Sequence, residues 1–130
     1  MMKHILVTGG AGFIGSNTVR YALEKGLAVT VMDSFENAVI SKHELLDLGV
    51  DVHELDIQNR QALKSISGQF DAIVHLAAQV SVPKSIQDPE RNHSINVNGT
   101  KNVLRFAQQN GVRRFIFASS SAVYGDCETM

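Results

Sequence analysis

A glycine-rich turn between an apolar run and a helix-forming run constrains the fold most. It lies in the segment Ile5-Leu-Val-Thr-Gly-Gly-Ala-Gly-Phe-Ile-Gly-Ser16. Three glycines recur in it at every third position: Gly9, Gly12 and Gly15. In such a turn the first glycine permits the sharp bend, the second lets a pyrophosphate approach the backbone, and the third lets helix and strand pack closely. The N–H groups near Phe13 and Ile14 would then face the phosphates, which predicts a dinucleotide site.

An acidic residue closes the second apolar run. Asp33, followed by Ser34, lies about twenty residues beyond the glycines, where a carboxylate binds the hydroxyls of the adenosine ribose. A carboxylate there would repel a 2′-phosphate, so NAD is predicted rather than NADP. Taken alone, Asp33 could equally be a turn former at a strand end. Asp56 and Ile57, at the end of the third run, could position the adenine, although an Asp that caps the next helix is equally natural.

Apolar runs alternate with helical patterns along the chain. Strands are predicted at 4–8, 28–33, 50–55, 72–76 and 115–118, and these runs lack the alternation of half-exposed strands. Helices are predicted from Phe13 to a C-terminal Gly26, and at 40–48, 59–66 and about 89–109. Pro83 and Pro89 are expected in a loop that leads into the last helix. The alternation predicts an α/β fold with a doubly wound parallel sheet of the Rossmann type.

Composition excludes several classes of protein. The 130 residues suit one domain, 1–130, and a net charge of -1 provides no basic excess for nucleic acid. No apolar run approaches the roughly 20 residues that cross a bilayer, and the first residues lack the pattern of a signal peptide. A soluble, cytoplasmic protein without membrane contact is therefore expected. The lone Cys127 cannot form an internal disulfide, and the five histidines show no ligand spacing, so no metal is predicted.

Three later segments complete a family resemblance. They are Val74-His-Leu-Ala-Ala78, Asn96-Val-Asn-Gly-Thr100 and Phe117-Ala-Ser-Ser-Ser-Ala-Val-Tyr-Gly-Asp126. With the glycine turn and the acid that follows it, they resemble the extended short-chain dehydrogenase/reductase family, specifically its NAD-dependent nucleotide-sugar epimerases and dehydratases. The resemblance runs from Lys3 to about Asp126, with all motifs in the family's order and spacing.

The resemblance assigns roles to residues after the fourth predicted strand. It implies that Leu76, Ala77 and Ala78 pass their backbone along the pyrophosphate and the nicotinamide ribose. Without it, these residues would be a small-residue bend. Asn96 would help to order the active site, although it could also be a polar residue facing solvent. His75 is interpreted as a satisfied core histidine rather than a base.

The serine run carries the implied chemistry. Ser120 matches the family's catalytic Ser/Thr, whose hydroxyl would hydrogen-bond the oxygen on C4 of the sugar; a polar loop is the alternative. Ser121 and Ala122 stand where nucleotide-sugar 4,6-dehydratases typically carry acidic residues. The resemblance therefore favours a UDP-hexose 4-epimerase, in which C4 gives a hydride to NAD⁺ and takes it back on the opposite face. A 4,6-dehydratase remains the further alternative.

The family's Tyr-x-x-x-Lys pair has one literal match, Tyr21-Ala-Leu-Glu-Lys25, which lies on the first predicted helix and is interpreted as chance. The resemblance thus implies the cofactor-binding half of an epimerase, truncated before the family's last strands, without the substrate domain and inactive alone. A non-catalytic dinucleotide-binding module or a remnant is the alternative.

Self-association into a homodimer or larger assembly is also expected from two uncovered surfaces. The first is the apolar face of the last predicted helix, with Ile95, Val103, Leu104 and Ala107. The second is the strand predicted at 115–118, with the segment after Tyr124 as a possible exchanged element.

Overall fold

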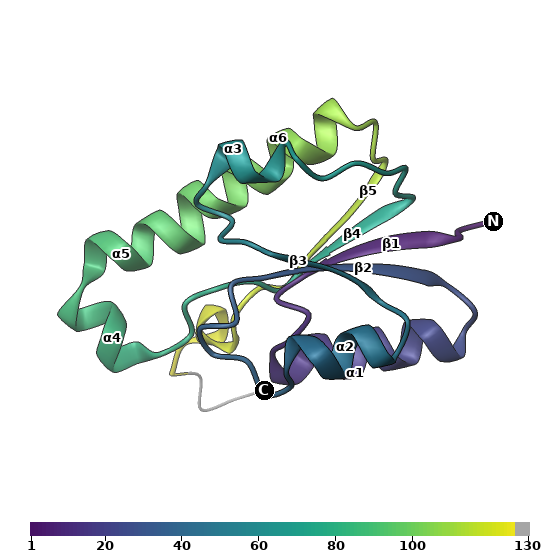
Figure 1. Ribbon diagram of the computed structural model, residues 1–130. Helices are drawn as coiled ribbons and strands as arrows, with labels where there is room; N and C mark the ends of the chain where they lie inside the picture. The colour runs from purple at the N-terminus through teal and green to yellow at the C-terminus, as the bar shows by residue number, and fades with distance from the viewer. Residues whose placement is uncertain (127–130) are drawn as a thin grey trace.

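The computed structural model describes residues 1–126. Five strands form one sheet in the order β3-β2-β1-β4-β5, and every neighbouring pair is parallel (Figure 1). The strands are β1 (His4–Thr8), β2 (Ala28–Asp33), β3 (Asp51–Glu54), β4 (Ala72–His75) and β5 (Arg114–Phe117). This topology confirms the predicted doubly wound sheet of the Rossmann type. Cys127 lies outside the described residues.

Helices cover both faces of the sheet, as Figure 1 shows. One face carries α1 (Phe13–Glu24) and α2 (Lys42–Asp47), and the other carries α3 (Arg60–Leu63) and α6 (Thr100–Gln109). The chain enters α6 through α4 (Val82–Gln87), α5 (Pro89–His93) and a π-helix (Ser94–Gly99). The segment 89–109 is therefore one continuous helical run, as predicted, but its middle is wound as a π-helix.

Two apolar layers explain why the strands lack alternation. Val7 of β1 belongs to a layer with Val19 of α1 and Leu45 of α2. Its neighbour Leu6 points to the opposite face and joins a second layer, which includes Val103 of α6. Because successive strand residues face opposite sides, a sheet with two covered faces needs apolar residues at consecutive positions.

Backbone conformation and local side-chain hydrogen bonds set the helix ends. Gly26 follows α1 with φ +75, the left-handed conformation that ends many helices. Ser41 and Glu44 form a reciprocal capping box at the start of α2. The side chain of Asn59 caps α3, so the expectation that Asp56 could cap that helix is wrong. Asp56 instead accepts the N–H of Gln58 at 2.8 Å.

The proline-containing segment differs from the predicted loop. Ser81 caps α4 by accepting the N–H of Lys84, and Pro83 lies within the first turn of this helix. Pro89 begins α5 in the same way. Proline is tolerated there because the first N–H groups of a helix have no intrahelical acceptor. Both prolines therefore start short helices rather than interrupt a loop.

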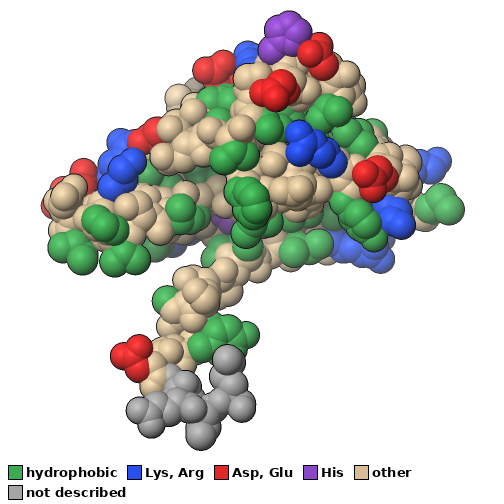
Figure 2. All heavy atoms as spheres, turned by 90° about the horizontal axis from the view of Figure 1, so that it is seen from below, with side chains coloured by type: hydrophobic (Ala, Val, Ile, Leu, Met, Phe, Trp, Pro, Cys, Tyr) green, Lys and Arg blue, Asp and Glu red, His purple; other side chains and the backbone are tan. Residues whose placement is uncertain are grey.

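The C-terminal strand is the least covered strand of the sheet. β5 forms one edge of the sheet, and Ile116 and Phe117 are 56% and 57% exposed. Residues 118–126, which include a 3-10 helix at Ser121–Tyr124, are all exposed and extend away from the body in Figure 2. The predicted uncovered face of the last helix is wrong in its main residues, because Val103 and Ala107 are buried against the sheet.

No helix within residues 1–126 combines the length and the apolar character that a membrane span requires.

Candidate functional site

The glycine turn joins β1 to α1 and forms the floor of a cleft. Gly9 has φ +72, and a Cβ there would lie 2.8 Å from the backbone nitrogen of Ala77. A Cβ on Gly15 would overlap the carbonyl oxygen of Gly9, so the first turn of α1 needs glycine to approach the loop. At Gly12 a Cβ would meet only that same oxygen within 4 Å, at 3.3 Å, and would otherwise occupy the cleft.

The start of α1 supplies unpaired donors to this cleft. Within the described part of the chain, no acceptor is recorded for the N–H groups of Phe13 and Ile14. Both side chains are exposed and line the cleft. These two apolar side chains therefore form part of the cleft wall and not of the core, although they follow the apolar spacing of the helix. Unpaired N–H groups at a helix start favour anionic ligands such as a pyrophosphate.

Asp33 ends β2, and its carboxylate accepts hydrogen bonds from the glycine turn and from the loop that follows β2. Its Oδ2 accepts the N–H of Ala11 in the glycine turn at 2.9 Å, and its Oδ1 accepts the N–H of Phe35 at 2.7 Å. The carboxylate is thus a turn former, as one interpretation of the sequence held, and it also lines the cleft together with Ser34. Each carboxylate oxygen has two acceptor sites, so capacity remains for ribose hydroxyls.

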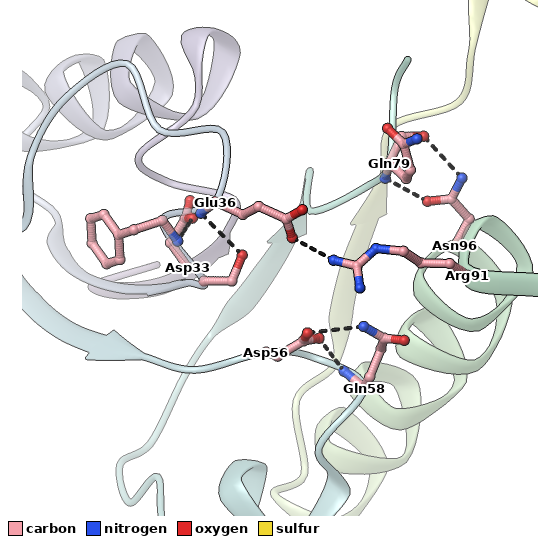
Figure 3. Close-up of polar contacts among 9 residues, drawn as sticks. Asp33, Glu36, Asp56, Gln58, Gln79, Arg91 and Asn96 are labelled. Atoms are coloured by element: carbon pink, nitrogen blue, oxygen red, sulfur yellow. Dashed lines mark hydrogen bonds and ion pairs between the residues drawn. The ribbon is translucent and has the colours of Figure 1, made fainter. Parts of the chain in front are cut away.

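The loop after β4 forms the opposite wall. Leu76, Ala77 and Ala78 line the cleft, and Gln79 follows them. Asn96, from the π-helix, does not line the cleft. Its Oδ1 accepts the N–H of Gln79 at 2.8 Å, and its Nδ2 donates to the Gln79 carbonyl at 3.1 Å (Figure 3). Asn96 therefore fixes the loop instead of facing solvent.

The cleft has a volume of about 760 Å³ and gathers most of the predicted residues. They come from the glycine turn and from the carboxyl ends of β2, β3 and β4: Gly9, Gly12, Phe13, Ile14, Gly15, Asp33, Ser34, Asp56, Ile57, Leu76, Ala77 and Ala78. The carboxyl ends of parallel strands form the usual ligand-binding edge of such a sheet.

Polar residues that the sequence did not point to also line the cleft. Glu36, after β2, reaches across to Arg91 of α5, and the Glu36 Oε2 to Arg91 Nη2 distance is 2.7 Å (Figure 3). Lys84 of α4 and Asn92 of α5 lie on the same side as Arg91. Lys84, Arg91 and Asn92 lie far along the chain from the glycine turn, and only an amphipathic pattern at 82–95 could have indicated them.

Ser120 lies next to the cleft but does not line it. Ala118 and Ser119, which directly precede it, are lining residues. The Oγ of Ser120 accepts the N–H of Ala122 at 3.2 Å and so caps the 3-10 helix. Tyr21 lies on α1 away from the cleft lining, with Lys25 Nζ 5.1 Å from the centre of its ring.

His75 is the titratable group nearest the cleft whose pKa is clearly shifted. It ends β4, is 2% exposed, and burial lowers its pKa to about 4. It is therefore a satisfied core histidine that is neutral at pH 7. Within residues 1–126, no three His, Cys, Asp or Glu side chains gather in a way that could hold a metal ion.

These features define a Rossmann-type α/β protein whose cleft fits a dinucleotide: unpaired N–H donors for phosphates, a space that a Cβ on Gly12 would fill, and a carboxylate for ribose hydroxyls. The chain belongs to the NAD dependent epimerase/dehydratase family, whose model matches residues 5–130.

Individual relatives agree with this assignment. The chain is 36% identical to the UDP-glucose 4-epimerase of Mus musculus over 137 aligned positions, which cover 96% of this chain and 40% of that protein. The UDP-Glc/GlcNAc 4-epimerase of Campylobacter jejuni superposes with a TM-score of 0.88 at 36% identity, covering 98% of this chain and 40% of that one.

A third relative was solved with the cofactor. The Thermus thermophilus UDP-glucose 4-epimerase in complex with NAD superposes with a TM-score of 0.80 at 34% identity, covering 90% of this chain and 37% of that one. The chain thus spans about 40% of the length of the relatives that it matches.

Proposed function

We propose that the chain is the NAD-binding part, residues 1–130, of a UDP-hexose 4-epimerase. The observation that carries the proposal is the joining of the glycine turn to Asp33 through the 2.9 Å bond from the Ala11 N–H. This bond joins two groups that line one cleft: the N–H groups that would bind phosphate and the carboxylate that would bind a ribose. The T. thermophilus relative solved with NAD supports the choice of cofactor.

Each wall of the cleft would hold a different part of the dinucleotide. The N–H groups of Phe13 and Ile14 would bind the pyrophosphate, and Asp33 with Ser34 would bind the adenosine ribose. Asp56 and Ile57 would flank the adenine. The backbone of residues 76–78 would line the nicotinamide ribose, with Asn96 holding that loop through Gln79.

Catalysis would take place at the end of the cleft formed by β5. Bound NAD would supply a hydride acceptor and donor for C4 of the sugar. The hydroxyl of Ser120 would hydrogen-bond the sugar oxygen on C4, which requires this side chain, at present outside the cleft lining, to reach into the cleft. The absence of acids at Ser121 and Ala122 supports the epimerase over the 4,6-dehydratase.

A non-catalytic dinucleotide-binding module is the second candidate. It is favoured by the position of Tyr21 and Lys25, which lie outside the cleft lining and so do not supply the family's Tyr-x-x-x-Lys base. The 130-residue chain is then expected not to interconvert UDP-glucose and UDP-galactose in a coupled assay with added NAD⁺. Turnover that Tyr21→Phe abolishes would contradict this and assign the base to α1.

Calorimetric titration tests the cofactor proposal. The 130-residue chain is expected to bind NAD⁺ more tightly than NADP⁺, because Asp33 repels a 2′-phosphate. Asp33→Asn should weaken NAD⁺ binding by about tenfold or more, the usual effect of losing a hydrogen bond to a charged group. Asp47→Asn is the matched control, since Asp47 is an exposed carboxylate of α2 outside the cleft. Equal affinity for both dinucleotides would remove Asp33 from its proposed role.

Self-association is a further proposal for the whole molecule. We infer self-association through the exposed edge strand β5, because Ile116 and Phe117 leave apolar surface uncovered there. A cytoplasmic location, a nucleotide-sugar substrate and the absence of a metal or nucleic-acid partner stay predictions from the sequence and its resemblance.

A further inference from the structure

His75 is held at both ring nitrogens inside the core. Its Nδ1 lies 2.7 Å from the Oγ1 of Thr8, the last residue of β1, and its Nε2 lies 2.9 Å from the Oγ1 of Thr100 at the start of α6. The rings of Phe115 and Phe117 lie 5.7 and 5.9 Å away, centre to centre. His75 itself does not line the cleft.

The partners of Thr100 fix the tautomer of the imidazole. The Thr100 hydroxyl donates its one hydrogen to the Asn96 carbonyl at 2.7 Å. Toward His75 its oxygen can therefore only accept, so the proton lies on Nε2. In the neutral ring Nδ1 is then the acceptor, and the Thr8 hydroxyl donates to it.

Thr8 connects His75 by hydrogen bonds to the loop after β4, residues 76–79. Its Oγ1 accepts the N–H groups of Leu76 and Ala77, each at 3.2 Å. The Leu76 N–H is shared with the Thr8 carbonyl oxygen, which lies 3.1 Å from it, whereas the Ala77 N–H donates to Oγ1 alone. With the O–H donated to His75, the hydrogen of this hydroxyl and its acceptor sites are engaged. The same Ala77 nitrogen would lie 2.8 Å from a Cβ on Gly9, so this loop lies directly against the glycine turn.

On the Thr100 side of His75, the series of hydrogen bonds leads back to the same loop. Asn96, whose carbonyl accepts from Thr100, holds Gln79 through two side-chain bonds of 2.8 and 3.1 Å (Figure 3). Residues 76–79, all of which line the cleft, are thus bonded at their start through Thr8 and at their end through Asn96. His75 is the link between the two attachments.

We propose that His75, as the neutral Nε2–H tautomer, is a positioning residue that holds residues 76–79 against the glycine turn. The consequence for NAD binding rests on the proposed function; the tautomer and the loop attachment do not. A second proton, on Nδ1, would compete with the Leu76 and Ala77 N–H groups for the same Thr8 oxygen, so the charged ring would weaken the attachment of the loop.

Within residues 1–126, no charged group contacts the ring in a way that would reverse this preference. The groups recorded against it within the described residues are Thr8 of β1, Thr100 of α6, and Phe115 and Phe117 of β5, and none of them titrates near neutral pH. Burial is the one cause of its lowered pKa.

Nitrogen-15 NMR of the 130-residue chain tests the tautomer directly. The expected spectrum has a protonated Nε2 and an unprotonated Nδ1 at pH 7. Thr100→Val removes the acceptor of the Nε2 proton and keeps the imidazole in the core. It should speed exchange of the Ala77 amide and weaken NAD⁺ binding by about tenfold, the usual effect of an unsatisfied buried donor. Thr100→Ser should restore both, because it returns the hydroxyl.

Thr18→Val is the matched control. Thr18 also donates to the carbonyl four residues earlier, that of Ile14 at 2.9 Å, but it lies on α1 outside the hydrogen-bond chain. A protonated Nδ1, or amide exchange in Thr100→Val equal to that in Thr18→Val, would overturn the proposal. If the unsubstituted chain bound no NAD⁺, the proposed function would fail, while the tautomer and the amide exchange would still decide the role of His75.

Discussion

At the scale of single residues, His75 makes stability depend on pH. Its pKa is about 4 in the folded chain against an ordinary 6.5, because burial disfavours the charged ring. As the pH falls, the unfolded chain takes up this proton first, so stability that is fully present above pH 6.5 is lost progressively toward pH 4. Linkage predicts a loss of roughly 2 kcal/mol in unfolding free energy between pH 7 and pH 5, measurable by urea unfolding.

His75→Gln provides the comparison for this effect. The variant keeps the other four histidines, so its unfolding free energy should change less over the same range. Glu44 and Asp71 act at lower pH. The backbone N–H of Ser41 lowers the pKa of Glu44 below its ordinary 4.5, and the backbone N–H of Lys3 lowers the pKa of Asp71 below its ordinary 3.8. The stability that these two carboxylates contribute is therefore lost only as the pH falls through and below those values. The prediction would be refuted if the unfolding free energy of the variant changed with pH as steeply as that of the unsubstituted chain.

Residues with a fixed chemical role at a fixed spacing could be predicted from the sequence. Gly9 and Asp33 are such residues in their placement, because both line the cleft to which the glycine spacing and the strand end assign them. The pairing of Glu36 with Arg91 could not be predicted, since exposed ionic residues distant in the chain carry no pattern that joins them. The bonds of Asn96 depend on the π-helix, which has no known pattern in side-chain spacing.

At the scale of elements, the first turn of α1 depends on the absence of a side chain at Gly15. Gly15→Ala would place a Cβ into the carbonyl oxygen of Gly9 and 2.8 Å from the Cα of Gly10. Overpacking of this kind costs about 1–3 kcal/mol of stability. Replacing glycine by alanine in a helix gains at most about 1 kcal/mol in helix propensity, so the net effect is destabilising. The midpoint of denaturant unfolding should fall, and NAD⁺ binding should weaken with the distorted turn.

Arg20→Ala is the control for this substitution. Arg20 is an exposed residue of the same helix, and alanine there has no new contact to make. A stability of Gly15→Ala equal to that of Arg20→Ala would mean that the loop gives way without cost, and the close approach of α1 to the glycine turn would not be required.

The elements themselves were predictable to different degrees. β1 and β2 match the predicted runs residue for residue, because buried parallel strands are continuous apolar segments. The helix α4 was missed because Pro83 indicates a loop when read alone, whereas the Ser81 cap makes it a helix start. Burial of Val103 was misassigned for a different reason: periodicity identifies an apolar face but not the surface that the face contacts.

At the scale of the whole molecule, the sheet order determines which surface remains open. β1 lies in the centre between β2 and β4, so the strand order reverses there, and the cleft forms at this topological switch point. β5 pairs with β4 on one side only, with Arg114 to Phe117 in register with Ala72 to His75. Among the described residues no strand pairs with its other edge, which lies beside the exposed Ile116 and Phe117 and is a surface suited to pairing with another strand.

A second copy of the chain is the occupant that we expect at this edge. Two identical edge strands related by a twofold axis pair antiparallel, so β5 would bond β5 in a homodimer. Light scattering at micromolar concentration should then give twice the mass of the chain or more. Ile116→Lys, a charge on the edge strand, should shift the chain toward monomer. Leu46→Lys is the control: Leu46 is similarly exposed, at 51%, but lies on α2, which packs near the opposite edge. A stable monomer that melts cooperatively before any substitution would rule out pairing through β5.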